Sequence, residues 1–455
     1  MVNPGISNQS HPRRQQHSRR FMVHALGLMS SLVFGCQATS NAKATGGVTV
    51  DTQAGCPAGV AAVLGDSSYA STQIALLSLE GEVQSSSFIS TASSQTDGLS
   101  FALSGDVVLP ASPPASGRIV ILDRFGTNVI TWVDTATAKV DAQLPVGTGF
   151  ESNPQDYLEI ANSRALVSRW GVNSNPGAQQ FDTGSDVLVV DDPTTGSQSA
   201  SNGGTNSRPA IESNIAIPGK DNLPPRPSNI TQIGNFAAVV LQRYSEDFST
   251  VGDAQIVRID LASLQIVQTL SLSGVSNCGR LMPMPGTSRY IMACTGPLNA
   301  NGNTSDLSRS AFVQLEVDNQ GEIAEKSRLA AADIAQEPLQ NDVTFANDHV
   351  VLVTTQTAFG GTTNNRLLAV NLNDKSVHQL AEARPGADGK GKGAVYGSAV
   401  CSPGCSAVCL LADSDEGVVR RFDVSKEPAV ELESVNVTPN VPLYPRQLAP
   451  YGGTP

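Results

Sequence analysis

The sequence predicts an all-β protein, a seven-bladed β-propeller with four-stranded blades, and three observations lead to this fold class. A short β-branched segment that ends in an acidic turn, such as Ile256 to Asp260, recurs along the chain. Successive copies lie 52 to 69 residues apart, which is the spacing of a repeat architecture. No amphipathic helix pattern of useful length interrupts them. The residues aligned with Asp260 are Ser78, Asp134, Asp191, Glu316, Asn371 and Asp423.

Each repeat contains the elements of one antiparallel sheet. A hydrophobic second strand precedes the recurring segment, and a polar turn and a fourth strand follow it, whereas the first strand is less clear. The second strands are predicted at 60–64, 118–123, 164–169, 236–241, 289–294, 349–354 and 406–411. The fourth strands are predicted at 83–90, 140–146, 214–218, 266–272, 322–329, 376–381 and 429–435. Radial repetition of such sheets protects their edges. A right-angled stack or β-helix is the alternative, but β-helix repeats are much shorter.

The first repeat lacks an inner strand of its own, because residues 60–64 already form its second strand. The C-terminal segment 445–450 has the pattern of an inner strand followed by a turn. We therefore expect the ring to be closed by a strand from the C-terminus, which would remove two open sheet edges.

The first 35 residues have the pattern of a lipoprotein signal peptide. A start with four arginines and no acid precedes a 14-residue apolar stretch and Gly35-Cys36. We expect Cys36 to be lipidated, residues 36–54 to form a flexible tether, and residues 55–455 to form the propeller. Gln37 favours an outer-membrane anchor in a bacterial cell envelope, by resemblance to sorted lipoproteins. Plain secretion or a misassigned start codon remains the alternative.

The charge balance excludes some partners. Without the four signal arginines the chain has 25 basic and 41 acidic residues, a net charge near −16. Such a charge opposes binding to nucleic acid and to anionic lipid. The partners that we expect are therefore the membrane, through the lipid on Cys36, and a protein or small anionic ligand. We expect no cofactor.

Six cysteines remain beside Cys36, as is typical of an oxidising compartment. Two pairs lie around Pro-Gly turns, and the last pair follows from ring closure, which brings the first and seventh blades together. The predicted disulfides are Cys278–Cys294, Cys401–Cys409 and Cys56–Cys405. A metal site at the last three cysteines of the chain is the alternative, but zinc sites usually need separated ligand pairs or histidine. We expect no metal.

The unit from Arg118 to Gly147 resembles the YVTN family of β-propeller repeats. The matching pieces are Asn128, the strand 129–134, Thr135 to Lys139 and Pro145 to Gly147, with Ala138 where the family usually has glycine. The other six units match loosely, and the whole chain resembles predicted lipoproteins of myxobacterial type. This resemblance implies a fold and a location, and it assigns no activity.

One face of the predicted propeller carries most of the long loops, namely those that join second to third strands and blade to blade. We call it the long-loop face, and we expect ligands there because long loops on a rigid scaffold often bind them. Second strands of three consecutive blades end on this face in arginine. The candidate ligand-binding residues are Arg124, Arg169, Trp170, Arg243 and Asp156. Arginine pairs well with carboxylate or phosphate, but pairing between strands would give the same pattern, and neutral lengthening would give the long loops.

Catalysis has little support in the sequence, and we assign no catalytic residue. The chain beyond the signal has only His349 and His378, and neither is expected at the hub. Nucleophile-elbow and zinc-protease motifs do not occur. The sequence therefore favours a non-enzymatic binding or assembly scaffold tethered at the cell envelope. A propeller-type hydrolase or lactonase is the alternative, because such enzymes share the fold and a fold alone does not give function.

Overall fold

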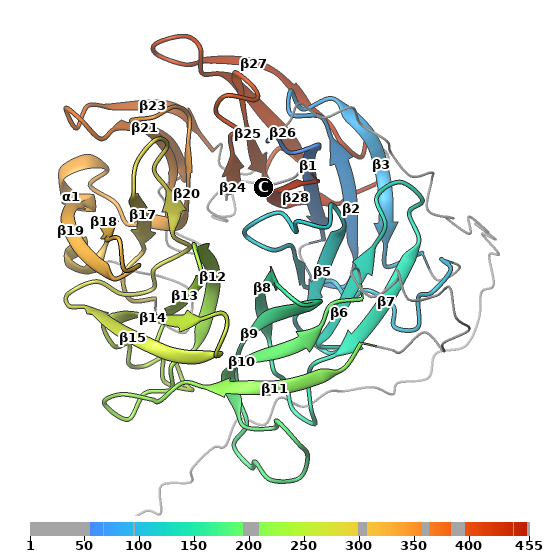
Figure 1. Ribbon diagram of the computed structural model, residues 1–455. Helices are drawn as coiled ribbons and strands as arrows, with labels where there is room; N and C mark the ends of the chain where they lie inside the picture. The colour runs from blue at the N-terminus through green and yellow to red at the C-terminus, as the bar shows by residue number, and fades with distance from the viewer. Residues whose placement is uncertain are drawn as a thin grey trace, which may run out of the picture. The chain divides into compact units, whose positions relative to one another are not determined.

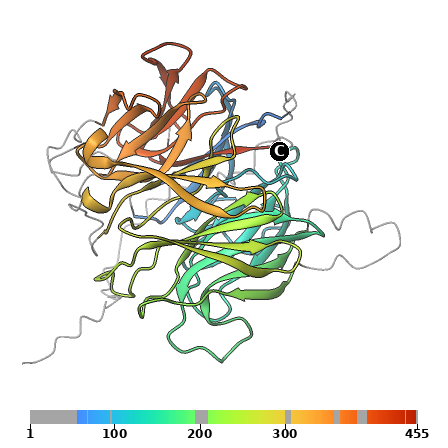
Figure 2. The same ribbon diagram turned by 60° about the vertical axis from the view of Figure 1, so that its left-hand side comes forward.

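The computed structural model describes residues 55–66, 68–93, 96–193, 209–298, 307–356, 364–383, 396–439 and 441–452. Within these residues, seven four-stranded antiparallel sheets surround one axis (Figure 1). Figure 2 shows the same blades obliquely. The predicted seven-bladed propeller is confirmed, whereas the predicted signal peptide, Cys36 and the whole predicted tether lie outside the described residues.

The four strands of every blade succeed one another from the hub to the rim. Blade 1 is β28 (Tyr444–Tyr451), β1 (Gly59–Gly65), β2 (Thr72–Leu77), β3 (Val83–Ser90), and blade 2 is β4 (Val107–Val108), β5 (Ile119–Asp123), β6 (Val129–Val133), β7 (Val140–Pro145). Blade 3 is β8 (Pro154–Ile160), β9 (Arg164–Val172), β10 (Gly184–Asp191), β11 (Ile211–Ala216), and blade 4 is β12 (Pro227–Ile233), β13 (Phe236–Leu241), β14 (Ala254–Asp260), β15 (Gln265–Leu272). Blade 5 is β16 (Met282–Pro283), β17 (Arg289–Cys294), β18 (Ala311–Val317), β19 (Ile323–Ala330), and blade 6 is β20 (Leu339–Phe345), β21 (Val350–Thr355), β22 (Arg366–Asn371), β23 (Val377–Glu382). Blade 7 is β24 (Tyr396–Val400), β25 (Val408–Asp413), β26 (Val418–Asp423), β27 (Val430–Val435).

The burial of the strands explains their composition. Second and third strands such as β5 and β6 are buried along their whole length, because both of their faces pack against neighbouring blades. The outer strand β15 alternates between half-buried and exposed residues, as expected of a strand with one solvated face. Seven apolar clusters fill the seams between neighbouring blades. The hydrophobic core therefore consists of seven clusters arranged in a ring, one between each pair of neighbouring blades.

The acidic residue that recurs after the third strand shapes a tight turn. Asp134 accepts hydrogen bonds from the backbone N–H and the hydroxyl of Thr137, and Asp260 does the same for Ser263. Four residues after Asp134, Ala138 has a left-handed backbone with φ of 57°. Glycine adopts this conformation most easily, so the position where YVTN-type repeats usually carry glycine also requires a glycine-like backbone here.

The C-terminal strand closes the ring as predicted. β28 pairs antiparallel with β1 and becomes the inner strand of blade 1. The disulfide Cys56–Cys405 joins the first blade to the seventh on the same seam, with a Cα–Cα distance of 5.7 Å. The other two disulfides also pair as predicted. Strand pairing and a covalent bond thus hold the seam together.

The helical content of the described residues is small. It comprises one turn of α-helix, α1 (Ala331–Ile334), and one 3₁₀ turn, η2 (Leu307–Arg309). In this part of the chain, no helix has the length and apolar character needed to cross a bilayer.

Candidate functional site at the hub

A polar cavity of about 270 Å³ lies at the hub, and we call it the cup. Its walls come from six of the seven blades. The polar side chains that line it are Arg124, Gln155, Ser228, Asn229, Gln242, Arg280, Asn341, Asp342 and Gln447. Arg124 and Gln242 directly follow the second strands β5 and β13, which places the cup on the long-loop face. The face predicted to carry a site therefore contains a cavity.

Two arginines line the cup, and each forms an ion pair with one carboxylate. Arg124 donates from Nε and Nη2 to Asp106 Oδ1, at 3.2 and 2.5 Å, and 28% of its side chain is exposed. Arg280 Nε lies 3.3 Å from Asp342 Oδ1, and its Nη1 donates to the Ala111 carbonyl. Arg280 Nε therefore forms an ion pair with Asp342 but has no hydrogen-bond partner among the described residues. Each guanidinium is thus held by one carboxylate and retains unused donors.

A chain segment forms the floor of the cup. Residues 109–117 make up nearly all of the connection between β4 and β5, and we call them the plug. Leu109 exchanges hydrogen bonds with the side-chain amide of Gln447, and the Ala111 N–H donates to Asp156 Oδ1 at 2.9 Å. Ala111 and Arg280 line both the cup and a second cavity beyond it. The plug therefore divides the hub into two compartments.

Asp156 anchors the plug and is fully buried. Its carboxylate accepts hydrogen bonds from the N–H groups of Ala111, Tyr157 and Ile230, at 2.8 to 2.9 Å. Burial raises the pKa of Asp156 to about 6, although these donors and Arg280 favour the charged form. Asp156 was predicted as a ligand-binding residue, and the structure places it beneath the cup as a link between three segments.

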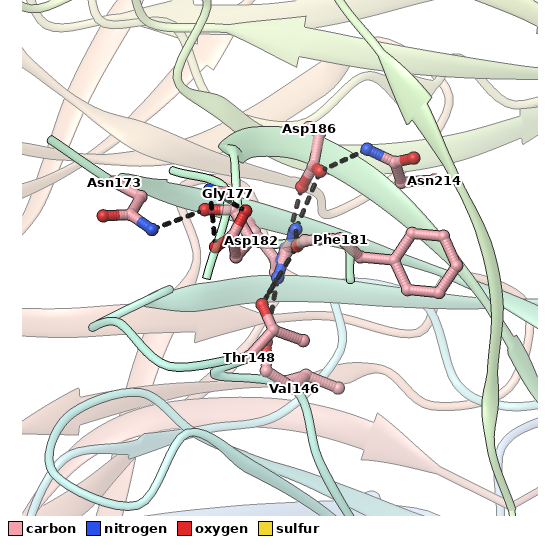
Figure 3. Close-up of polar contacts among 9 residues, drawn as sticks. Val146, Thr148, Asn173, Gly177, Phe181, Asp182, Asp186 and Asn214 are labelled. Atoms are coloured by element: carbon pink, nitrogen blue, oxygen red, sulfur yellow. Dashed lines mark hydrogen bonds and ion pairs between the residues drawn. The ribbon is translucent and has the colours of Figure 1, made fainter. Parts of the chain in front are cut away.

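Arg169 lies fully buried in blade 3, away from the cup. Its Nε and Nη2 form a fork with the carboxylate of Asp186, at 2.8 and 2.7 Å. The remaining donors reach the Val146 carbonyl, the Thr148 hydroxyl and the Phe181 carbonyl. Figure 3 shows this network, in which Asn214 also donates to Asp186. All five N–H groups are used within the protein, which favours the structural interpretation of this residue.

Arg243 and Trp170 also have partners within the protein. Arg243 is 1% exposed and donates to the Asp253 and Lys220 carbonyls and to Asp221. The guanidinium of Arg226 covers the Trp170 ring at 3.9 Å, and Phe248 stacks on it at 5.6 Å. Trp170 Nε1 donates to Gln242 Oε1 at 2.9 Å, so its contact with the cup is indirect. Of the predicted ligand-binding residues, Arg124 alone lines the cup.

The described residues contain no group of three or more His, Cys, Asp or Glu side chains placed to hold a metal ion. His349 lies directly before β21, with Nδ1 2.5 Å from Asp348 Oδ1, and His378 lies on the outer strand β23. Both positions agree with their predicted placement away from the hub.

The main residue that sequence reasoning missed is Arg280. It precedes the two-residue strand β16, where the first-strand pattern is too short to indicate which side chains reach the hub. The amides of Asn229 and Asn341 lie on the inner strands β12 and β20, and they were missed because the first strands were not assigned from the sequence. Their polar character inside otherwise buried strands was the available signal.

No protein-family model and no curated protein matches this chain. Among solved structures, a periplasmic gluconolactonase of Pseudomonas aeruginosa is similar with a TM-score of 0.53 and 12% identity, covering 87% of this chain and 99% of the other. A hypothetical selenium-binding protein of Sulfolobus tokodaii is similar with a TM-score of 0.50 and 10% identity, covering 88% and 92%. At such identities, these likenesses show the propeller fold alone.

Proposed function

We propose that this protein is a binding propeller whose cup takes a small anionic ligand. The observation that carries the proposal is the surplus of donors on Arg124 and Arg280. Among the described residues, no protein acceptor takes Nη1 of Arg124 or Nη2 of Arg280. Guanidinium forks suit carboxylate and phosphate groups, and bonds to charged acceptors are the stronger ones.

The rest of the cup suits a ligand with a polar body. Amide side chains of Gln155, Asn229, Gln242 and Asn341 surround the two arginines, and each amide offers both donors and an acceptor. The volume of about 270 Å³ lies just below the usual range for small-molecule sites, which suits a compact ligand. A compact carboxylate with hydroxyl groups would use both features.

A direct binding measurement tests this proposal. Gluconate and citrate are titrated into the full body of the protein by calorimetry, with ethylene glycol as the uncharged probe. Arg280→Gln and Arg124→Gln should each weaken anion binding about tenfold, as expected for loss of a charge-assisted pair. The control is Arg118→Gln, because Arg118 pairs with Asp141 and does not line the cup. Equal binding by the control and both cup variants would reject the proposal.

Lactone hydrolysis is the second candidate function. The observation that favours it is the carboxylate of Asp342, which lies in the cup beside Arg280 and could position water near a bound carbonyl. The structural similarity to a gluconolactonase shows a fold that such an enzyme uses. Incubation with glucono-δ-lactone distinguishes the two functions: hydrolysis above the uncatalysed rate that disappears in Asp342→Asn would favour the enzyme.

We further propose that the protein is a lipoprotein of YVTN-repeat type, anchored through Cys36 to the outer membrane of a bacterial cell envelope. The basic start, the apolar stretch and Gly35-Cys36 support this location. Cys36→Ser should release the body into the soluble fraction. Unchanged membrane retention without a lipid mass shift would contradict it.

A further inference from the structure

A second cavity lies on the other side of the plug, and we call it the chamber. It has a volume of about 480 Å³. It is lined by the segment before β1, by residues of β16 and β17, and by the loop before β25, so it opens on the face opposite the cup. Its volume falls within the usual range of small-molecule sites.

The chamber walls are mostly apolar and rigid. Leu158, Met282 and Tyr290 contribute side chains that favour apolar or aromatic surface. Prolines, whose rings fix the backbone, form much of the remaining wall. These are Pro57, Pro113, Pro114, Pro283, Pro403 and Pro450. A ligand would therefore meet a largely preformed surface.

The two charged side chains that line the chamber differ in whether they have an oppositely charged partner. Glu159 lines it, accepts hydrogen bonds from the N–H and hydroxyl of Ser116, and lies beside Asp192. Within the described residues, no basic side chain forms an ion pair with Glu159. The other charged lining residue, Arg280, forms its ion pair with Asp342, which lines the cup but not the chamber. Glu159 is therefore the charged group of the chamber wall without an oppositely charged partner among the described residues, and burial, together with the neighbouring Asp192, raises its pKa.

We propose that the chamber is a second ligand-binding site, specific for a compact aromatic ammonium compound whose nitrogen pairs with Glu159. Glu159 is half-buried and has no basic partner among the described residues, so an ammonium group beside it would favour its charged form. The ring of the ligand would pack against Tyr290 and Met282. The aromatic face of Tyr290 would in addition attract the positive charge of the ligand. An anion of the same shape would be repelled by Glu159. The two compartments would then select opposite charges on either side of one plug.

This proposal does not depend on the proposed function of the cup. The probes are 2-phenylethylammonium, its neutral isostere 2-phenylethanol, and the anion 3-phenylpropanoate, each titrated into the full body of the protein by calorimetry. The ammonium should bind about tenfold more tightly than the alcohol, and the anion should bind more weakly than either, as expected for one charge pair in a partly dry site.

Two variants locate the site. Glu159→Gln keeps the side-chain shape and should weaken ammonium binding about tenfold while leaving alcohol binding unchanged within about twofold. Ala115→Trp places a large side chain from the exposed part of the plug into the chamber and should abolish binding of all three probes. The matched control is Arg124→Gln, which alters the cup and should leave chamber binding unchanged.

Each outcome decides the proposal. Ammonium binding that is absent at millimolar concentration, or no tighter than alcohol binding, would overturn it. Retained binding in Ala115→Trp would overturn the location. If Glu159→Gln lowers the melting temperature too far for titration, the order of the three probes and the effect of Ala115→Trp decide instead. Loss of anion binding in the cup would leave the chamber result untouched.

Discussion

Arg169 and Arg124 lie at the same end of the second strands in neighbouring blades, yet their surroundings differ. The Arg169 side chain is fully buried, and its five N–H groups all find acceptors in blades 2 and 3. The Arg124 side chain is partly exposed, uses one carboxylate oxygen and faces a cavity. The comparison shows that the number of donors left over, rather than the residue type, separates a structural arginine from a candidate binding arginine.

The largest effect that follows from this comparison is the loss of Arg169. Arg169→Ala would leave Asp186 buried with Asn214 as its remaining side-chain partner. We expect the free energy of unfolding to fall by about 3–5 kcal/mol, because an unpaired buried carboxylate is strongly unfavourable. Urea unfolding of the purified protein measures this. Arg169→Lys keeps the charge but not the two parallel hydrogen bonds. We expect its free energy of unfolding to lie between those of the wild type and Arg169→Ala. An unchanged unfolding midpoint in Arg169→Ala would break the structural interpretation.

Asp156→Asn tests whether the plug depends on its anchor. An asparagine at this position offers one acceptor oxygen where the carboxylate offers two, so the Ile230 or Ala111 N–H would lose its partner. We expect a loss of about 1–3 kcal/mol at neutral pH, the usual cost of an unsatisfied buried donor. Thermal or chemical unfolding measures the change, and the Arg118→Gln surface variant serves as control.

The same carboxyl group predicts a pH dependence. Burial raises the pKa of Asp156 to about 6 in the folded protein, above the ordinary value near 4, so the folded state binds the proton more tightly than the unfolded state. The contribution of Asp156 to stability should therefore increase as pH falls from about 6 toward 4 and decrease as pH rises through 6. The difference in unfolding free energy between wild type and Asp156→Asn, measured across this window, should follow that direction. A difference that does not change with pH would contradict it.

We expect the loss of stability on removing Arg243 to lie between the losses expected for Arg169 and Arg124. It is buried, but its carboxylate partner Asp221 is 69% exposed, and its Nε makes no hydrogen bond in the described structure. Arg243→Ala should lower the unfolding free energy by about 1–2 kcal/mol, mainly through the Lys220 and Asp253 carbonyls left without their donor. A loss as large as that of Arg169→Ala would show that donor count is a poor guide.

The smallest effect on stability is expected for Arg124. Its ion pair with Asp106 is partly exposed, and such pairs contribute about 1 kcal/mol or less. Arg124→Ala should leave the melting temperature nearly unchanged while weakening anion binding in the cup. A large drop in melting temperature would show that Arg124 has a structural role like that of Arg169, and would contradict the distinction between the two.

The sequence alone determined the repeat, the strand order and the covalent pairing. The spacing of the third-strand motif and its β-branched residues indicate blades that bury both faces, and the aspartates at their ends indicate the turns that Asp134 and Asp260 form. The missing inner strand of the first blade was enough to predict closure by the C-terminus and hence Cys56–Cys405. These features are local or follow from the periodicity, so a pattern in the chain can reveal them.

Only the tertiary structure decided which polar side chains meet at the hub. Ala111, Arg280 and Gln447 come from different blades, and the ring brings them to one plug. Whether an arginine has donors to spare depends on acceptors such as the Val146 and Phe181 carbonyls, which belong to other segments. Periodicity places a residue at the end of a strand, but the acceptors around it are set by packing between segments far apart in the chain.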